Sequence, residues 1–345
     1  MTRIILLPAL VTLLTTLIVV SAIFRWSGPA LLDLPNARSL HRTPTPRGGG
    51  LGICVGLVIG LAIWWIVAPA AGETPLWPAL LVVGFVTFVS FLDDLHPLAF
   101  SVRLIAHGAA AAMLLWLVGP FEVLRIPLLG FFAVAWWGLL LSLLWCVGLT
   151  NAYNFMDGID GIAAMQGLVG GLAWGAIGLT VSQPIVAVLG FLVAAACGAF
   201  LRFNWHPARI FMGDVGSGTL GMLFAAIPLL ANAASPGEGW AAPVGVLVVW
   251  PFVFDAGATF LCRLFRGEHV FSAHRSHYYQ RLVLAGWSHP RVAGLYGMLA
   301  LATGGGALVI ALGDTLAGLF AWGSALGTAI ILPFLVWRAE RPAKL

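Results

Sequence analysis

Residues 4–24 of the chain read IILLPALVTLLTTLIVVSAIF and contain no charged side chain. A run of about 20 apolar residues is long enough to cross the hydrocarbon core of a bilayer as an α-helix. The whole chain has this character, because 61% of its 345 residues are hydrophobic and only 9% are charged. Soluble domains carry about 25% charged residues, so a soluble enzyme is excluded, as are a disordered chain and a disulfide-rich secreted scaffold. The sequence predicts an all-α, polytopic integral membrane protein.

Further apolar runs follow the first, and several contain Gly or Pro, which membrane helices tolerate better than soluble helices do. We expect about eleven transmembrane helices, over residues 4–24, 50–68, 77–92, 100–118, 130–149, 162–181, 184–200, 217–232, 242–262, 291–311 and 315–337. The connections between them leave no room for a large soluble domain. We therefore expect a single transmembrane domain over residues 1–345.

The positive charges fall on one side of this arrangement. One alternating set of connections comprises residues 25–49, 93–99, 150–161, 201–216, 263–290 and the C-terminal tail. With the adjoining span ends, this set holds all of the 17 Lys and Arg residues except Arg3 and Arg125. The positive-inside rule makes this side cytoplasmic, with the N-terminus outside and the C-terminus inside. Because Arg25 follows the first run, we expect a retained span there rather than a cleaved signal peptide.

Most acidic residues lie on the same side, and ionisable groups near a membrane are functional candidates. Asp93 and Asp94 end one apolar run, and adjacent carboxylates repel one another unless a cation or a shared proton compensates. A solvated helix end and a site for cation binding or acid–base chemistry both remain open for this pair. Asn151, Asn154, Asp157 and Asp160 recur three residues apart among glycines. This pattern fits a site that a ligand approaches closely, although one amphipathic helix end would have the same spacing.

The segment FMGDVGSG, residues 211–218, opens the next expected span. Glycines before a helix expose backbone N–H groups that bind phosphate. Asp214 would be repelled by that phosphate unless a divalent metal lay between them. Mg²⁺ held by one or two carboxylates and by substrate phosphates is a common arrangement.

Basic residues complete the pattern. Residues 263–291 carry several arginines and histidines, among them His274 and His277, which would share a face if the stretch were helical. Arg42 and Arg47 belong to a second basic loop, beside Gly48–Gly50. These groups fit either a substrate with several phosphates or attraction to lipid headgroups. The residues alone predict a membrane enzyme with a cytoplasmic, Mg²⁺-dependent site for a phosphorylated substrate.

Taken together, the motifs resemble those of the polyprenyl-phosphate N-acetylhexosamine-1-phosphate transferase family, which is glycosyltransferase family 4. The matching segments are DLPNARSLH (33–41), PTPRGGG (44–50), DD (93–94), NAYNFMDGIDG (151–161), FMGDVGSGTLG (211–221), DAGATFLCR (255–263) and SAHRSHYYQRL (272–282). They occur in the family's order and cover most of the chain, which makes the resemblance specific.

The resemblance implies a reaction in which a polyprenyl phosphate, such as undecaprenyl phosphate, attacks a UDP-N-acetylamino sugar. UMP leaves, and a polyprenyl-diphosphate-linked sugar remains in the membrane. It also implies Mg²⁺, for which Mn²⁺ can substitute, and an active site on the cytoplasmic face of the bacterial inner membrane. Membrane lipids are expected partners, a homodimer is compatible with the sequence, and no nucleic acid is expected.

Residue roles follow from the same resemblance. Asp214 is an expected metal ligand, with Asp93 and Asp94 near the metal and the lipid phosphate, and Asp93 is the candidate base. Asn151, Asn154, Asp157 and Asp160 would line the nucleotide side, and Phe211 would stack on uracil. The expected catalytic set is Asp93, Asp94, Asp157, His274 and His277. The expected substrate-binding set is Asn151, Asn154, Asp160, Phe211, Arg42, Arg47 and Arg281.

Three departures from the family pattern bear on the substrate. The chain reads DDLHP at 93–97, where a third acid is frequent; Ser39 stands where a basic residue is common; and Tyr278 replaces a further histidine of some members. They disfavour a muramoyl-pentapeptide substrate and favour a start of O-antigen, teichoic-acid or capsule-like glycans. The alternative from another class is a transporter or flippase for a phosphorylated solute. A third possibility is a phosphotransferase that uses a CDP-alcohol, but the chain lacks the closely spaced acidic helix motif expected of such an enzyme.

Overall fold

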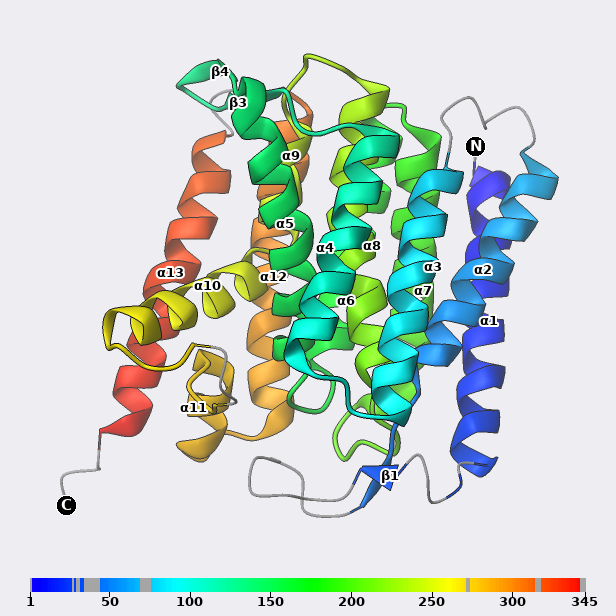
Figure 1. Ribbon diagram of the computed structural model, residues 1–345, viewed down its shortest axis with the longest axis vertical. Coiled ribbons are helices and arrows are strands. Elements are labelled where there is room, and N and C mark those ends of the chain that lie inside the picture. Colours follow the sequence, from blue (N-terminus) through cyan, green and yellow to red (C-terminus); the bar gives the residue numbers. More distant parts are fainter. Residues whose placement is uncertain are drawn as a thin grey trace.

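The computed structural model describes residues 2–26, 28, 32–33, 44–68, 76–270, 274–313 and 318–341. Within this part of the chain, ten helices are long and apolar enough to cross a membrane. A further pair, α9 and α10, is bent by 80° at a short break. Most helices run side by side in one bundle (Figure 1). The chain is thus an all-α, multi-pass membrane protein, as the composition predicts.

The first half of the bundle contains the helices α1 (Thr2–Trp26), α2 (Gly50–Val67), α3 (Trp77–Leu95), α4 (Phe100–Val118), α5 (Ala135–Met156) and α6 (Ile162–Thr180). The second half contains α7 (Pro184–Asn204), α8 (Asp214–Ala234), α9 (Ala241–Val248), α10 (Trp250–Phe265), α11 (Tyr278–Leu284), α12 (His289–Ala311) and α13 (Gly318–Glu340). Two short antiparallel pairs accompany them: β1 (Leu32–Asp33) with β2 (Thr45–Pro46), and β3 (Val123–Ile126) with β4 (Gly130–Ala133).

The core of the bundle surrounds α8. Within its most apolar window, 94% of the residues of α8 are buried, against 28% for the peripheral helices α1 and α13. Small residues allow membrane helices to pack closely, and α6 and α7 use them. A Cβ atom on Gly190 of α7 would lie only 2.7 Å from the carbonyl oxygen of Gly171 in α6. Close packing of this kind keeps the helices around α8 in fixed positions.

The segment expected as a span over residues 242–262 is not one continuous helix but two helices bent by 80°. The helix ends at Val248, and Trp250 begins α10, which leaves the bundle sideways (Figure 1). Pro251 lies at the start of α10, where its missing N–H removes no helical hydrogen bond. One face of α10 buries Asp255 and Arg263, and the other exposes apolar side chains such as Phe265. This amphipathic character suits a helix that lies across the bundle.

Other boundaries also differ from the expected spans. Residues 130–133 form a strand of the β3–β4 hairpin, so the span expected from residue 130 begins at Ala135. Conversely, α3 and α5 continue past residues 92 and 149, and α8 begins before residue 217. Asp93, Asp94, Asn151, Asn154 and Asp214 therefore belong to helix ends, whereas Asp157 and Asp160 lie in the connection between α5 and α6.

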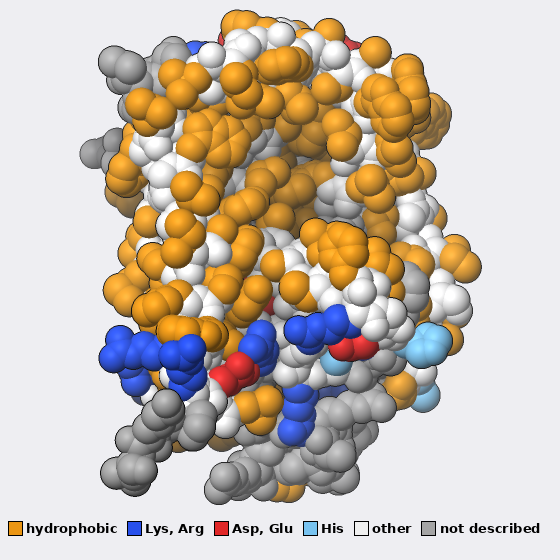
Figure 2. All heavy atoms as spheres, turned by 90° about the vertical axis from the view of Figure 1, so that its left-hand side faces the viewer, with side chains coloured by type: hydrophobic (Ala, Val, Ile, Leu, Met, Phe, Trp, Pro, Cys, Tyr) orange, Lys and Arg blue, Asp and Glu red, His pale blue; other side chains and the backbone are white. Residues whose placement is uncertain are grey.

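Charged side chains gather at one end of the molecule. Figure 2 shows Arg, Asp, Glu and His side chains at the lower end, below a surface of hydrophobic side chains that encloses a hollow. The β3–β4 hairpin lies at the opposite end, and β1 and α11 lie near the charged end (Figure 1). The one-sided placement of charge that the sequence predicts is thus present in the fold.

Candidate active site

The carboxylate of Asp94 joins the end of α3 to the start of α8. Its two oxygens accept hydrogen bonds from the backbone N–H groups of Asp214, at 3.0 Å, and Val215, at 2.9 Å. Such N–H groups have no partner within their own helix, and a negative charge there is favourable. Gly213 has φ +76°, and a Cβ atom on it would lie 2.7 Å from Oδ2 of Asp94. Only glycine permits this close approach.

Asp93 lies beside an arginine that the sequence analysis did not include in the site. Its Oδ1 accepts a hydrogen bond from the N–H of Leu98 at 2.6 Å, and its Oδ2 accepts one from Nη1 of Arg103 at 2.9 Å. The same Nη1 lies 3.6 Å from Oδ2 of Asp214. Arg103 thus places a positive charge between two carboxylates. In the sequence, the one sign that Arg103 belongs to the site is that it is a single arginine in the first turn of an apolar span.

Asn154 ties α5 to the first turn of α8. Its Nδ2 donates to Oδ1 of Asp214 at 2.8 Å and lies 3.1 Å from Oγ of Ser217. Asn151, one turn earlier, donates to the carbonyl oxygen of Val147 at 2.7 Å. Three helices, α3, α5 and α8, therefore bring together side chains from motifs that are far apart in the sequence.

A polar cavity of about 330 Å³ opens next to these carboxylates. Its lining includes seven residues that the sequence analysis singled out: Arg47, Asp94, Asn154, Asp157, Asp160, Phe211 and Asp214. Ser217, Gln280 and His289 line it too. The buried Nε of Arg47 has no hydrogen-bond partner among the described residues. Since leaving a buried donor unpaired is costly, this arginine fits a ligand that supplies acceptor oxygens.

Asp157 and Asp160 lie between α5 and α6 in different electrostatic surroundings. Burial raises the pKa of the Asp157 carboxyl well above its usual range, and the charges of Asp214, Asp94 and Asp160 raise it further. Burial also acts to raise the pKa of Asp160, but the contacts with His289 and His206 and the N–H of Ala208 outweigh it and hold that pKa below its usual value. Two neighbouring carboxyl groups with separated pKa values suit different roles.

A second, apolar cavity of about 490 Å³ lies between α4, α5 and α10. We refer to it as the apolar groove. Its walls include Phe100, Leu104, Leu144, Val253 and Phe260. Polar side chains of Asn151, His274 and His277 also line it. The two histidines therefore lie at the groove and not in the polar cavity.

A small crevice lies between the two cavities. Asp93 and Arg103 line it. It shares Asn154 and Asp214 with the polar cavity. It shares Asn151 and Phe155 with the apolar groove. The polar cavity and the apolar groove thus both adjoin the crevice that the carboxylates of Asp93 and Asp214 line.

The histidine segment is not helical at residues 274–276, so the idea that His274 and His277 share a helix face is wrong. His277 instead precedes α11 as its N-cap residue, and the two imidazole rings lie 4.9 Å apart. Buried Asp255 of α10 holds this segment in place. It accepts hydrogen bonds from the N–H groups of Tyr278, at 2.9 Å, and Tyr279, at 3.1 Å, and lies 3.2 Å from Nδ1 of His277. Asp255 belonged to a motif of the sequence analysis but had no assigned role.

One expected substrate-binding residue, Arg281, does not line these cavities. Arg281 forms a bidentate pair with Glu340 at the end of α13, at 2.8 and 2.6 Å. This pair raises the pKa of the guanidinium. Arg42 lies outside the described residues. Their roles in substrate binding stay predictions.

Comparisons with known proteins find a matching family model and related sequences. Residues 76–232 match the model of glycosyl transferase family 4. A probable undecaprenyl-phosphate N-acetylglucosaminyl 1-phosphate transferase of Bacillus subtilis (strain 168) is 30% identical over 81% of this chain and 77% of its own length. A decaprenyl-phosphate N-acetylglucosaminephosphotransferase of Mycobacterium tuberculosis is 33% identical, over 75% and 70% respectively. A phospho-N-acetylmuramoyl-pentapeptide-transferase of Synechococcus sp. is 32% identical, over 81% and 84%.

Proposed function

The chain belongs to glycosyl transferase family 4, and on this premise we propose that it transfers an N-acetylamino-sugar-1-phosphate from a UDP-sugar to undecaprenyl phosphate. A phosphate oxygen of the lipid attacks the phosphorus that carries the sugar. The bond from that phosphorus to the oxygen of the UMP group breaks, and UMP leaves with the electron pair. One diphosphate replaces another, so the enzyme chiefly aligns two anions and compensates their charge.

The observation that carries the proposal is that the polar cavity and the apolar groove both adjoin the crevice that Asp93 and Asp214 line. A water-soluble nucleotide sugar fits the first, and a hydrocarbon chain fits the second. Their phosphates would then come together at the crevice that Arg103 lines. A transporter would instead bind one solute, usually near the middle of the bilayer, and the two chemically different cavities favour the transferase.

Phe211, Asp157 and Asp160 line the polar cavity, where the nucleotide would bind. Phe211 would stack on the uracil, and Arg47 would pair with the diphosphate. His274, His277 and Asn151 line the apolar groove, where they would contact the phosphate of the lipid. Arg103 would balance negative charge between Asp93 and Asp214 before and after transfer.

We propose Mg²⁺ as the metal, with Asp214 and Asp93 as its protein ligands. The neighbouring donors are carboxylate oxygens, which Mg²⁺ prefers, together with substrate phosphates. Asp94 is a third carboxylate nearby, and because both of its oxygens accept hydrogen bonds from backbone N–H groups of α8, it would also orient the start of that helix. Bound Mg²⁺ would neutralise charge on the diphosphate, and Mn²⁺, which also prefers oxygen ligands, would substitute.

The direct test incubates purified protein with undecaprenyl phosphate, Mg²⁺ and a panel of UDP-N-acetylamino sugars. We expect release of UMP and a lipid whose mass increases by one sugar phosphate. Asp214→Asn should abolish nearly all of this turnover, whereas Arg202→Gln, an exposed position at the end of α7, should not. If no sugar yields UMP while a related enzyme works under the same conditions, the proposal is wrong. Uptake of an unchanged solute into proteoliposomes would instead support the transporter.

We further propose that the site faces the cytoplasm at the bacterial inner membrane and that the product starts a cell-envelope glycan such as O-antigen. The concentration of arginines at the site end supports this orientation. The relatives are named for N-acetylglucosamine and for N-acetylmuramoyl-pentapeptide. The same assay identifies the sugar, because each UDP-sugar is tested separately.

A further inference from the structure

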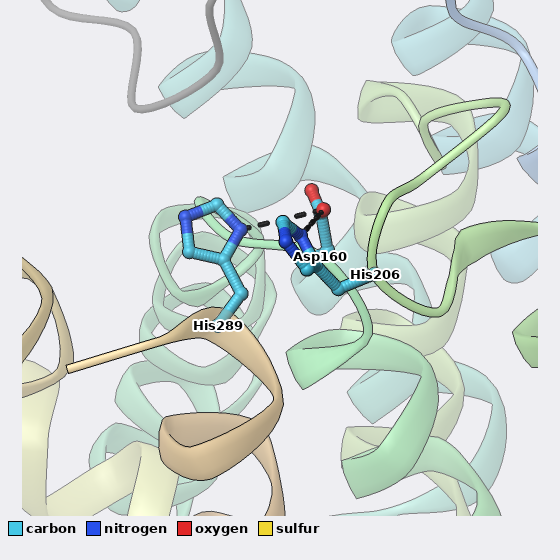
Figure 3. A group of neighbouring side chains, drawn as sticks. All are labelled: Asp160, His206 and His289. Atoms are coloured by element: carbon cyan, nitrogen blue, oxygen red, sulfur yellow. Dashed lines mark hydrogen bonds and ion pairs between the residues drawn. The ribbon is translucent and has the colours of Figure 1, made fainter.

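Three connections of the bundle meet at a carboxylate and two imidazoles. Asp160 lies just before α6, His206 lies between α7 and α8, and His289 is the first residue of α12. Oδ2 of Asp160 is 2.5 Å from Nδ1 of His206 and 3.4 Å from Nδ1 of His289. Figure 3 shows both rings beside this oxygen. Among the described residues this is the one group of at least three His, Cys, Asp or Glu residues whose possible metal-ligand atoms all lie within 4.8 Å of one another.

Hydrogen bonding accounts for only part of this cluster. Oδ2 of Asp160 has His206 as one partner and accepts a hydrogen bond from the N–H of Ala208 at 3.1 Å. Nδ1 of His289 is buried, and apart from its 3.4 Å contact with this same Oδ2 it has no hydrogen-bond partner in the described part of the chain. A buried polar atom without a partner carries a desolvation cost. A cation that is bound by all three side chains would remove this cost and balance the carboxylate.

The donor atoms indicate which cation fits. Mg²⁺ prefers oxygen ligands, whereas imidazole nitrogen suits Zn²⁺, copper, iron and nickel. Zinc binds His nitrogen and carboxylate oxygen at about 2.0–2.2 Å, which separates tetrahedral ligands by roughly 3.3 Å. The spacing to His289 already matches, and His206 would need to withdraw by less than about 1 Å. The His206 side chain is 43% exposed, so it has room to do so.

We propose that Asp160, His206 and His289 form a binding site for a transition-metal ion of the Zn²⁺ type. The site is separate from the all-oxygen carboxylates at Asp93 and Asp214. It would fasten the connection before α6, the connection before α8 and the start of α12 to one another. Asp160 and His289 also line the polar cavity, so water or a ligand in that cavity can occupy the fourth position of the metal. This proposal does not depend on the sugar transferred or on transferase activity.

The first experiment measures binding on untagged, chelator-stripped protein in detergent, by competition between the protein and a coloured zinc chelator. We expect one equivalent of Zn²⁺, which a millimolar excess of Mg²⁺ does not displace. His206→Ala and His289→Ala should each weaken binding tenfold or more. His96→Ala, at an exposed histidine directly after α3, is the matched control and should leave the affinity unchanged. The proposal would be overturned if the protein bound no Zn²⁺, or if all variants bound Zn²⁺ with equal affinity.

A second measurement uses the unmodified protein, so its result does not depend on whether a variant folds. Co²⁺ added to the stripped, unmodified protein should give visible absorption bands of four-coordinate cobalt with nitrogen ligands, and Zn²⁺ should remove them. A spectrum of six-coordinate, oxygen-bound cobalt would contradict the proposal. Because the metal binds the folded state, Zn²⁺ should also raise the unfolding temperature of the unmodified protein and of His96→Ala, but not that of His206→Ala.

Discussion

At the scale of single residues, the carboxylates of the site differ in their hydrogen-bond partners. Asp93 and Asp94 are adjacent in the sequence and have the same chemistry, yet one bonds to Arg103 and Leu98, and the other bonds to the first turn of α8. Adjacent positions on a helix point about 100° apart, so the two side chains meet different neighbours. One motif therefore supplies two carboxylates with different hydrogen-bond partners.

Arg103 provides a prediction about charge balance. In Arg103→Gln, Asp93 and Asp214 lose the cation that now lies between them, so their combined negative charge should attract a divalent cation more strongly. We expect turnover to fall tenfold or more while the apparent affinity for Mg²⁺ rises. Titration of activity with Mg²⁺ measures both quantities, and Arg202→Gln serves as the control. A lower apparent affinity for Mg²⁺ in Arg103→Gln would contradict this view of the arginine.

Gly213 provides a prediction about backbone conformation. Its φ of +76° with ψ of 170° is accessible almost only to glycine, and a Cβ atom would press against the carboxylate of Asp94. Gly213→Ala should cost about 1–3 kcal/mol of stability and should reduce turnover, because α8 must shift. Thermal unfolding in detergent measures the first effect. Gly84→Ala, an exposed helical glycine of α3 with open space around it, should be neutral or slightly stabilising; an equal loss there would refute the argument.

At the scale of elements, the sequence predicted most helices well because each is a long apolar run between polar segments. It failed where an apolar run changes direction. Residues 242–262 are apolar except for Asp255 and Thr259, and Pro251 is too common in membrane helices to indicate a break of 80°. Phe131 and Phe132 likewise extend an apolar run, although they form a strand that follows the turn at Gly130. Composition shows that a segment avoids water, but its direction is set by the elements packed against it.

The apolar groove provides a prediction at this scale. Gly257 of α10 lines the groove, and a Cβ atom on it would meet no other atom within 4 Å. Gly257→Leu should therefore fill part of the groove without a clash. We expect KM for undecaprenyl phosphate to rise about tenfold and KM for the UDP-sugar to stay the same. Initial rates over a range of each substrate provide the values, and Gly84→Leu on α3 is the matched control. Equal changes in both KM values would show that the groove does not select the lipid.

At the scale of the whole molecule, the sequence predicted which motifs matter but not how they touch. Asp94 and Asp214 are 120 residues apart, and no periodicity within one helix connects them. Arg47 and Phe211 were predicted as substrate contacts and line the same cavity. Arg281 was grouped with them by its motif, yet it pairs with Glu340. His206 and His289 were not singled out together, because each is a lone histidine in its own segment. Which of these side chains come into contact depends on packing between helices that are far apart in the sequence.

The path of α9 and α10 leads to a prediction about topology. In Figure 1, α9 lies near the hairpin end and the chain after α10 leads to α11 near the charged end, so we expect Gly237, before α9, and Gly267, after α10, to lie on opposite sides of the membrane. Both are turn glycines with positive φ and open surroundings, which suits insertion of a reporter. Reporters that are active only in the cytoplasm or only outside should give opposite results at the two positions. The same result at both would mean that the pair does not cross.

The sideways exit of α10 has a consequence for how the lipid would travel. Leu104, Leu144 and Phe260 line the apolar groove and are also exposed on the outer surface of the bundle, so the groove is open to the surrounding membrane. Withdrawing a hydrocarbon chain from a bilayer costs about 0.8 kcal/mol per CH₂, which is prohibitive for a long polyprenyl chain. Through a side opening, the substrate arrives and the product departs by diffusion within the plane of the membrane. Encounter then depends on lipid density per unit area, and detergent tails become competitors for the same entrance.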